Sequence, residues 1–222
     1  VPPTNNSQIS SKNDHLKIVL VVVCCMLMPG LAAAQLKVGF LVPVSGLGDQ
    51  SFNDMSYAGI VKARNDFGFT LIVGQCETGT ISHRVEMEKL LDEGADIVIA
   101  NGWEFAPTIK EHARKYPDKT FIINDEAVTD FDNIISTVFS QHEGAFLAGA
   151  LAAMVSKTGH VGFVGGMDIP VIRSFFVGFK EGVEFISKEI QIRLNYLGGD
   201  GDVGIGFDNP GLGYKIALEQ YD

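Results

Sequence analysis

Short apolar runs alternate with helical patterns along most of this chain, and that alternation constrains the fold more than any other feature. The first run, residues 36–44, is apolar almost throughout, as expected of a strand buried on both faces of a parallel sheet. Strands that alternate with helices of this length are typical of βαβ units. The sequence therefore predicts an α/β fold with a doubly wound parallel sheet, and strands are expected at residues 36–44, 69–73, 96–100, 120–124 and 133–139.

The helices that link these strands are expected at about residues 54–68, 82–93 and 105–116. Pro107 falls in the first turn of the third helix, where proline is tolerated because that backbone N–H has no partner within the helix. Spacing and charge predict three side-chain arrangements: a capping box formed by Ser51 and Asp54, an inward-facing row of Val85, Leu90 and Leu91, and an ion pair between Glu111 and Lys115 worth roughly 0.3 kcal/mol.

A second series of elements begins after the fifth strand. The helix expected at residues 141–156 is apolar nearly all round, so we expect it to be buried on most of its sides. Strand patterns at residues 160–164 and 190–196 and helical patterns at 172–184 and 212–220 follow. Two strands are too few for a sheet that helices cover on both faces. We therefore expect a second lobe that is truncated in this chain, and a sequence that is a fragment of a longer protein.

The first 34 residues have the pattern of an exported protein. A polar stretch is expected to be disordered, and basic residues then precede the apolar run at residues 18–28. A Pro-Gly pair and small residues come next, which predicts a secretory signal peptide cleaved before Gln35. The alternative, a transmembrane anchor, needs roughly 18–20 apolar residues, more than this run provides. We therefore expect the protein to act in the periplasm or another extracytoplasmic space.

The cysteines bear on the same prediction. Cys24 and Cys25 lie inside the apolar run without the small-residue box that a lipoprotein signal needs, so a soluble exported protein is expected rather than a lipid-anchored one. Cleavage would leave Cys76 alone, which excludes an internal disulfide, and its place at the end of a strand pattern predicts a buried thiol. The expected segments are a disordered extension with a signal peptide (1–34), an N-terminal ligand-binding lobe (35–139) and a partial second ligand-binding lobe (140–222).

Charge and motif content argue against several functions. The formal net charge is −10 and the lysines and arginines are scattered, so no nucleic-acid partner is expected. The histidines after the signal peptide show no metal-ligand spacing with cysteine or glutamate. The sequence also lacks a Gly-x-Ser-x-Gly nucleophile elbow. We therefore expect no metal, no cofactor and no enzyme activity.

The most informative loop, residues 46–53, lies between the first strand and the first helix. A glycine-punctuated loop in that position is where open α/β sheets bind their ligands. It carries Asp49, Phe52 and Asn53, which could grip a small polar ring compound but do not form a catalytic set. Structural alternatives remain, because Asp49 or Asn53 could cap the helix and Phe52 could seal the core. Trp103, after the third strand, is either a stacking surface for a ligand or a packing residue.

Four parts of the chain carry a recognisable pattern: residues 48–53, residues 115–118 with the strand 121–124, residues 143–149, and residues 162–170 with 179–182. In their order and spacing they resemble the basic membrane protein family of solute-binding proteins. The resemblance spans about residues 36–221, and the best understood members of the family bind purine nucleosides for ABC import. It implies a type I periplasmic binding protein fold, in which two Rossmann-like lobes joined by hinge strands hold a ligand in the cleft between them.

The resemblance also implies roles for individual residues. Asp49, Phe52 and Asn53 would lie on the cleft rim of the first lobe, Asp125 would meet the base, and Phe207 would stack on it from the second lobe. Asp125 could instead pair with a basic residue across the cleft. A purine offers flat faces to aromatic rings and N–H groups to a carboxylate, so these residue types suit it. The family's later ribose contacts, an Asp and a Lys, would lie beyond residue 222.

The predicted function is that of an extracytoplasmic solute-binding protein of an ABC importer. It would be a monomer that binds a purine nucleoside or a similar heterocycle and delivers it to the transporter permease. Its mechanism would be hinge closure around the ligand, with no chemistry. Two alternatives remain: a ligand-sensing domain of a signalling protein on the same fold, and an exported α/β hydrolase, for which no nucleophile with a nearby base is visible.

Overall fold

The structure is a computed structural model that describes residues 35–77, 79–199 and 203–221. The predicted extension and signal peptide, residues 1–34, lie outside the described residues. Within the described part of the chain, none of the helices combines the length and the apolar character that crossing a membrane requires.

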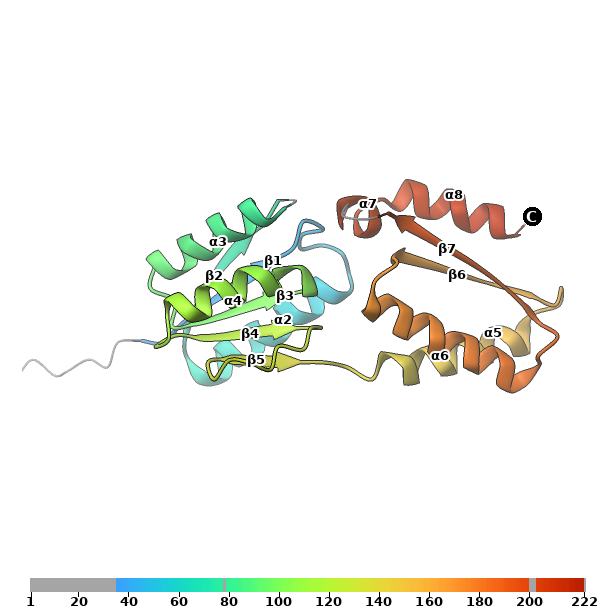
Figure 1. Cartoon of the computed structure of the whole chain (residues 1–222), viewed down its shortest axis with the longest axis horizontal. Coiled ribbons are helices and arrows are strands. Elements are labelled where there is room, and N and C mark those ends of the chain that lie inside the picture. The colour runs from blue at the N-terminus through green and yellow to red at the C-terminus, as the bar shows by residue number, and fades with distance from the viewer. Residues whose placement is uncertain (1–34, 78, 200–202, 222) are drawn as a thin grey trace, which may run out of the picture. The chain divides into compact units, whose positions relative to one another are not determined.

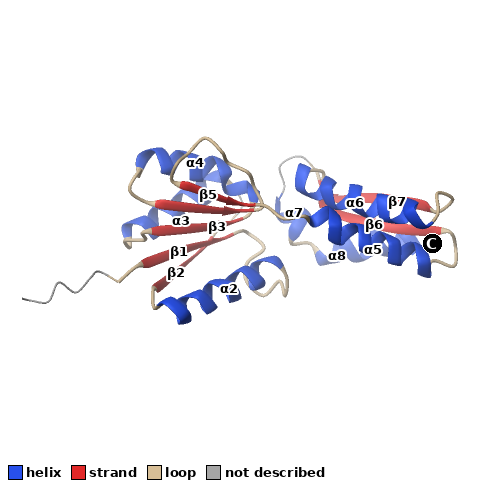
Figure 2. Cartoon of the chain, turned by 90° about the horizontal axis from the view of Figure 1, so that it is seen from below, coloured by secondary structure: helices blue, strands red, loops and turns tan. Residues whose placement is uncertain are grey.

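Five parallel strands form the first sheet, in the order β2-β1-β3-β4-β5 (Figures 1 and 2). The helices α2, α3 and α4 link the first four strands, and a short 3₁₀ turn, η1, precedes α4. This order and the parallel pairing are those of a doubly wound sheet, and they confirm the predicted α/β fold class. The elements are β1 (Lys37–Val42), α2 (Phe52–Phe67), β2 (Thr70–Gln75), α3 (Thr80–Asp92), β3 (Ile97–Asn101), η1 (Trp103–Phe105), α4 (Ala106–Lys115), β4 (Thr120–Asn124) and β5 (Ile134–Thr137).

The two faces of this sheet pack against different helices. On one face, Phe40 of β1 packs with Ile60 of α2. On the other face, Leu41 belongs to a cluster with Met87 of α3 and Ile109 of α4. Because successive residues of a strand point to opposite faces, a strand covered on both sides must be apolar at every position. Phe40 and Leu41 are both fully buried, which explains the continuous apolar run of the first strand.

The inward face of α3 differs in part from the prediction. Leu90 and Leu91 are buried as expected, but Val85 is 44% exposed. The buried stripe passes instead through His83 and Met87. Those two residues are four positions apart and Met87 is three before Leu90, which is the spacing of one helix face. Val85 lies two positions from both His83 and Met87, so the helical geometry turns it toward solvent.

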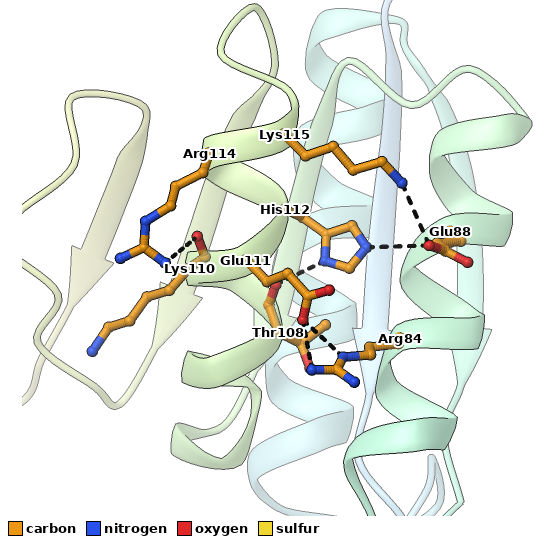
Figure 3. Close-up of polar contacts among 8 residues, drawn as sticks. All are labelled: Arg84, Glu88, Thr108, Lys110, Glu111, His112, Arg114 and Lys115. Atoms are coloured by element: carbon orange, nitrogen blue, oxygen red, sulfur yellow. Dashed lines mark hydrogen bonds and ion pairs between the residues drawn. The ribbon is translucent and has the colours of Figure 1, made fainter.

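Charged side chains join α3 to α4 at the surface (Figure 3). The predicted ion pair within α4 between Glu111 and Lys115 is wrong. Glu111 accepts a hydrogen bond of 2.8 Å from Nε of Arg84, and Nζ of Lys115 lies 3.6 Å from Oε1 of Glu88. Both α4 side chains reach across to α3 because opposite charges face them there. The pairs are exposed, so each contributes at most about 1 kcal/mol.

A separate two-stranded parallel sheet follows, formed by β6 (His160–Met167) and β7 (Gln191–Gly198). Its helices are α5 (Gln141–Val155), α6 (Pro170–Ile186), α7 (Val203–Phe207) and α8 (Pro210–Tyr221). The sequence did not predict α7, because Gly204 and Gly206 have low intrinsic helix propensity and gave that stretch the look of a loop.

The prediction that α5 is buried on most of its sides is wrong. Its buried residues are Ala145, Gly149 and Ala153, one on each successive turn, whereas Leu147 and Leu151 are 69% and 61% exposed. A Cβ at Gly149 would overlap the backbone carbonyl of a residue in α6, so the two helices touch backbone to backbone. The small side chains therefore face α6, whereas Leu147 and Leu151 point away from it.

Candidate functional site

Asp49 caps α2, in place of the predicted capping box. The side chain of Ser51 makes no capping hydrogen bond. Instead, Oδ1 of Asp49 accepts from the backbone N–H groups of Ser51 (3.0 Å) and Asp54 (3.1 Å), and Oδ2 accepts from that of Asn53 (2.9 Å). Asp54 in turn accepts from the N–H of Gly48 at 2.7 Å. Burial acts to raise the pKa of Asp49, but the backbone N–H groups outweigh it and hold that pKa below its usual value.

A row of hydrogen-bonded side chains crosses the carboxyl ends of the strands beneath this loop. Asn53 is 1% exposed, and its Nδ2 donates to the carbonyl of Gly46 at 2.8 Å. Its Oδ1 accepts from Nδ2 of Asn101 at 2.8 Å, and Oδ1 of Asn101 accepts from Nδ2 of Asn124 at 2.9 Å. Oγ1 of Thr137 completes the row by donating to Oδ1 of Asn124 at 2.6 Å. We call these four residues the amide ladder.

Sequence reasoning missed three members of the ladder and gave the fourth, Asn53, a role as a ligand contact or an N-cap. The structure shows that the Asn53 side chain bonds to the ladder and to its own loop. A usable signal was present, since β3 and β4 are apolar strands that both end in asparagine. Asn101 and Asn124 are direct partners in the parallel register, so two amides at those positions must meet.

A cavity of about 380 Å³ lies over the carboxyl ends of β1, β3 and β4, within the range of roughly 300–1,000 Å³ usual for ligand pockets. All the residues predicted as ligand contacts line it: Asp49, Phe52, Asn53, Trp103, Asp125 and Phe207. The other lining residues are Pro43, Ser45, Ser51, Asn101, Gly102, Glu104, Val171, Ile172 and Phe175. The structure thus brings together six side chains from sequence positions between 49 and 207.

Aromatic rings form much of the apolar wall. Phe52 and Phe207 keep 37% and 41% of their surface exposed, so neither is a core residue sealed away from the cavity. Trp103 opens η1, two positions after the last residue of β3. The ring of Phe207 is held against β6 because Gly166 has no side chain, and a Cβ there would lie 2.6 Å from the ring. The wall therefore offers fixed aromatic faces on which a flat ligand could stack.

Two half-buried carboxyl groups, Asp125 and Glu104, line the same cavity. Asp125 is the predicted acidic contact to the ligand. Its φ of +66° is strained for a residue with a side chain. Burial raises its pKa, and the neighbouring Glu126 raises it further. Glu104, which sequence reasoning missed, has its pKa raised to about 7, chiefly by burial. Its own backbone acts to lower that pKa, and Asp125 acts to raise it.

The raised pKa of Glu104 predicts a pH-dependent cost to stability. A folded-state pKa of about 7, above the usual 4.5, means that the folded protein binds more protons than the unfolded chain between those values. Stability is therefore lost as the pH rises from about 4.5 to 7. Glu104→Gln should raise the free energy of unfolding by about 2 kcal/mol at pH 8 and change it little at pH 4. Urea denaturation at the two pH values measures this, and an equal effect at both would contradict it.

A second cavity, of about 570 Å³, lies between α4 and the segment before β5. Lys110, Arg114 and Phe131 line it, and the guanidinium of Arg114 sits 4.8 Å from the Phe131 ring centre. Although this cavity is larger, it lies at the amino ends of the strands, and open α/β sheets bind ligands at the carboxyl ends. We therefore assign the candidate site to the smaller cavity. Among the described residues, no group of His, Cys, Asp or Glu is arranged to hold a metal ion.

Comparison with known proteins agrees with this assignment. The family described as "ABC transporter substrate-binding protein PnrA-like" matches residues 36–208. Basic membrane protein A of Borreliella burgdorferi is 32% identical over 161 residues, which cover 71% of this chain and 47% of that protein. The ABC transporter nucleoside-binding protein BmpA of Lactococcus lactis subsp. cremoris is 26% identical over 198 residues, covering 86% of this chain and 54% of that protein. The chain thus spans about half the length of the curated relatives it matches.

A solved structure shares the fold. The ABC transporter solute-binding protein from Aeropyrum pernix K1 superimposes with a TM-score of 0.67 at 24% identity, over 83% of this chain and 60% of that one. The predicted type I periplasmic binding protein fold is confirmed, and the chain covers part of it. The matched family consists of substrate-binding proteins, which confirms the prediction of a non-enzyme and argues against the hydrolase alternative. The match over residues 36–208 shows that the chain belongs to the PnrA-like family of ABC transporter substrate-binding proteins, the basic membrane protein family that its motifs predicted.

Proposed function

We propose that the protein binds a purine nucleoside, or a similar heterocycle, in the 380 Å³ cavity and delivers it to the permease of an ABC importer. It would act as a monomer in the periplasm or another extracytoplasmic space. The observation that carries this proposal is the composition of the cavity wall, which combines partly exposed aromatic rings with half-buried carboxyl groups. Aromatic faces suit a base, and carboxylates accept hydrogen bonds from its N–H groups and from ribose hydroxyls.

Other observations support the same ligand class. Phe52, Trp103 and Phe207 come from three separate segments, so two of them could lie on opposite faces of one flat ring. Asp125 would accept from the base edge. Asp49 and Asn53 line the cavity, and their side chains hold the loop that carries Phe52 through hydrogen bonds to its backbone. The name of the Lactococcus relative, a nucleoside-binding protein, points the same way.

Trp103 provides the test, because it is the single tryptophan of the sequence and it lines the cavity. Guanosine, inosine or adenosine should change its fluorescence with a saturable dependence on concentration. Loss of one stacking face in Phe207→Ala should weaken binding by about tenfold, since stacking on an aromatic side chain contributes about 1–3 kcal/mol per base. Phe67→Ala is the matched control, because that ring is 82% exposed at the end of α2, outside the cavity.

Testing several compounds distinguishes a nucleoside-binding site from a site for another ligand. Riboflavin and simple sugars should leave the fluorescence and the melting temperature unchanged. A response to either of them, without a response to nucleosides, would retain the family and discard the nucleoside. Equal weakening by Phe67→Ala and Phe207→Ala would place the ligand elsewhere.

A further inference from the structure

The candidate cavity has an unusual balance of charge. Asp49, Glu104 and Asp125 line it, and none of its described lining residues is a lysine, arginine or histidine. The carboxylate of Asp49 is already occupied by backbone N–H groups. That leaves Glu104 and Asp125 as two acids that face one cavity without a basic side chain to pair with in its wall. Such a wall suits a ligand that supplies several N–H donors.

Glu104 is placed in the cavity by local backbone geometry. It is the second residue of η1, directly after Trp103. Gly102 has a φ of +138°, and a Cβ there would overlap the Glu104 carboxylate, so the absence of a side chain at Gly102 makes the space that the carboxylate fills. Phe105, the next residue, is fully buried and anchors the turn in the core. The residues on either side of Glu104 therefore fix the position of its carboxyl group, because Gly102 leaves the space for it and Phe105 anchors the turn.

Resting on the proposed nucleoside-binding function, we propose that Glu104 is a specificity-determining residue that, with Asp125, selects bases carrying a ring N–H beside an exocyclic amino group. The edge of such a base presents its ring N–H and its amino group as neighbouring hydrogen-bond donors, and the carboxylates of Glu104 and Asp125 offer acceptors for both. Hydrogen bonds to a charged group contribute more than neutral ones, so a base without the amino group should bind about tenfold more weakly. Guanosine and inosine differ by this one amino group and form a matched pair of probes.

The selected ligand should also displace a proton. Four titratable groups in the described part of the chain surround Glu104. Two are acids, Asp125 after β4 and Asp49 in the loop. The others are the thiol of Cys76 after β2 and the ring of His83, which packs on Phe105 beside Glu104. Burial raises the pKa of Cys76 to about 12 and lowers that of His83, so both are neutral near pH 7. Glu104, with a pKa of about 7, is thus the group that titrates there. Because donors bind the ionised form, affinity should rise with pH.

The experiment is calorimetric titration of the protein with guanosine and with inosine at pH 6 and pH 8, in two buffers of different ionisation enthalpy. We expect guanosine to bind about tenfold more tightly than inosine at pH 8, with a rise of about tenfold in guanosine affinity between pH 6 and 8. Proton release should appear as a buffer-dependent enthalpy. Glu104→Gln should abolish the pH dependence and most of the preference for guanosine, and circular dichroism checks that the variant is folded.

Glu126→Gln is the matched control, because it removes the same charge beside Asp125 from a residue outside the cavity wall. It should leave the ratio of guanosine to inosine affinity unchanged. Equal affinities for the two nucleosides without proton release would overturn the role of Glu104 and leave nucleoside binding intact. A preference for guanosine over inosine that survives in Glu104→Gln would also overturn the role of Glu104 and leave nucleoside binding intact. Failure of the unmodified protein to bind either nucleoside would instead remove the proposed function, and the inference with it.

Discussion

Asn101→Leu should lower the free energy of unfolding by about 4 kcal/mol, because it leaves the buried Asn53 amide and the half-buried Asn124 amide without a partner, at about 1–3 kcal/mol each. Asn101 is fully buried in the centre of the amide ladder. Leucine has a similar size, so little of the loss would come from a cavity. Oδ1 of Asn53 and Nδ2 of Asn124 would each lose the bond of 2.8 or 2.9 Å that Asn101 provides.

Urea denaturation followed by circular dichroism measures this loss. Asn65→Leu is the control, since Asn65 is exposed on α2 and its side chain accepts a hydrogen bond of 3.4 Å from the adjacent Arg64 at the surface. Surface changes of this kind stay within about 0.5 kcal/mol. If Asn101→Leu proved as mild as Asn65→Leu, the ladder would not be a source of stability. A loss of stability with an unchanged transition slope would show that the substitution lowers stability without changing the surface that unfolding exposes.

The second large effect is expected where α5 touches α6. Gly149→Ala should destabilise the protein by about 3 kcal/mol or more, at or above the upper end of the usual cost of overpacking. The new methyl group would overlap the carbonyl oxygen of Phe179. That obstacle is backbone within a helix, so it cannot turn away as a side chain would. Gly178 and Gly182 of α6 make the reciprocal approach, to the carbonyls of His142 and Phe146.

The same helix provides an internal control. Gly144 also lies in α5, but a Cβ there would meet no atom within 4 Å. Gly144→Ala should therefore stabilise the protein by up to about 1 kcal/mol, through helix propensity alone. Melting temperatures of the two variants should move in opposite directions. A gain in stability for both would mean that α5 and α6 are not in close contact in solution.

The strands and the candidate cavity were predictable from sequence for an identifiable reason. A strand buried on both faces must be apolar at successive positions, and residues 36–44 satisfy that rule without help from the rest of the chain. Loops after such strands meet at one edge of a parallel sheet, so Phe52 and Trp103 could be assigned to one site before their contacts were known, whereas the role of Asp125 came from the family resemblance. Phe207 depended on the family resemblance, because its glycine-rich surroundings carry little periodic signal.

The errors arose where a side chain had several possible partners. Glu111 and Lys115 have the spacing of an ion pair, yet each finds its opposite charge on α3, and sequence spacing contains no information about a neighbouring helix. Ser51 has the right place for a cap, but Asp49 reaches the same N–H groups with a charged acceptor, which forms the stronger bond. Glu104 was missed because an acid in a surface turn and an acid buried in a cavity look alike in sequence.

The position of the amide ladder in the sequence has a consequence for how such a receptor can change its ligand. Phe52 directly precedes one ladder residue, Asp125 directly follows another, and Trp103 and Glu104 come two and three positions after Asn101. These four candidate recognition residues are therefore chain neighbours of residues that fasten the sheet edge. Mutations at positions 52, 103, 104 and 125 can redraw the cavity while Asn53, Asn101 and Asn124 keep the frame, which makes recognition and folding separable targets for evolution and for a designed library.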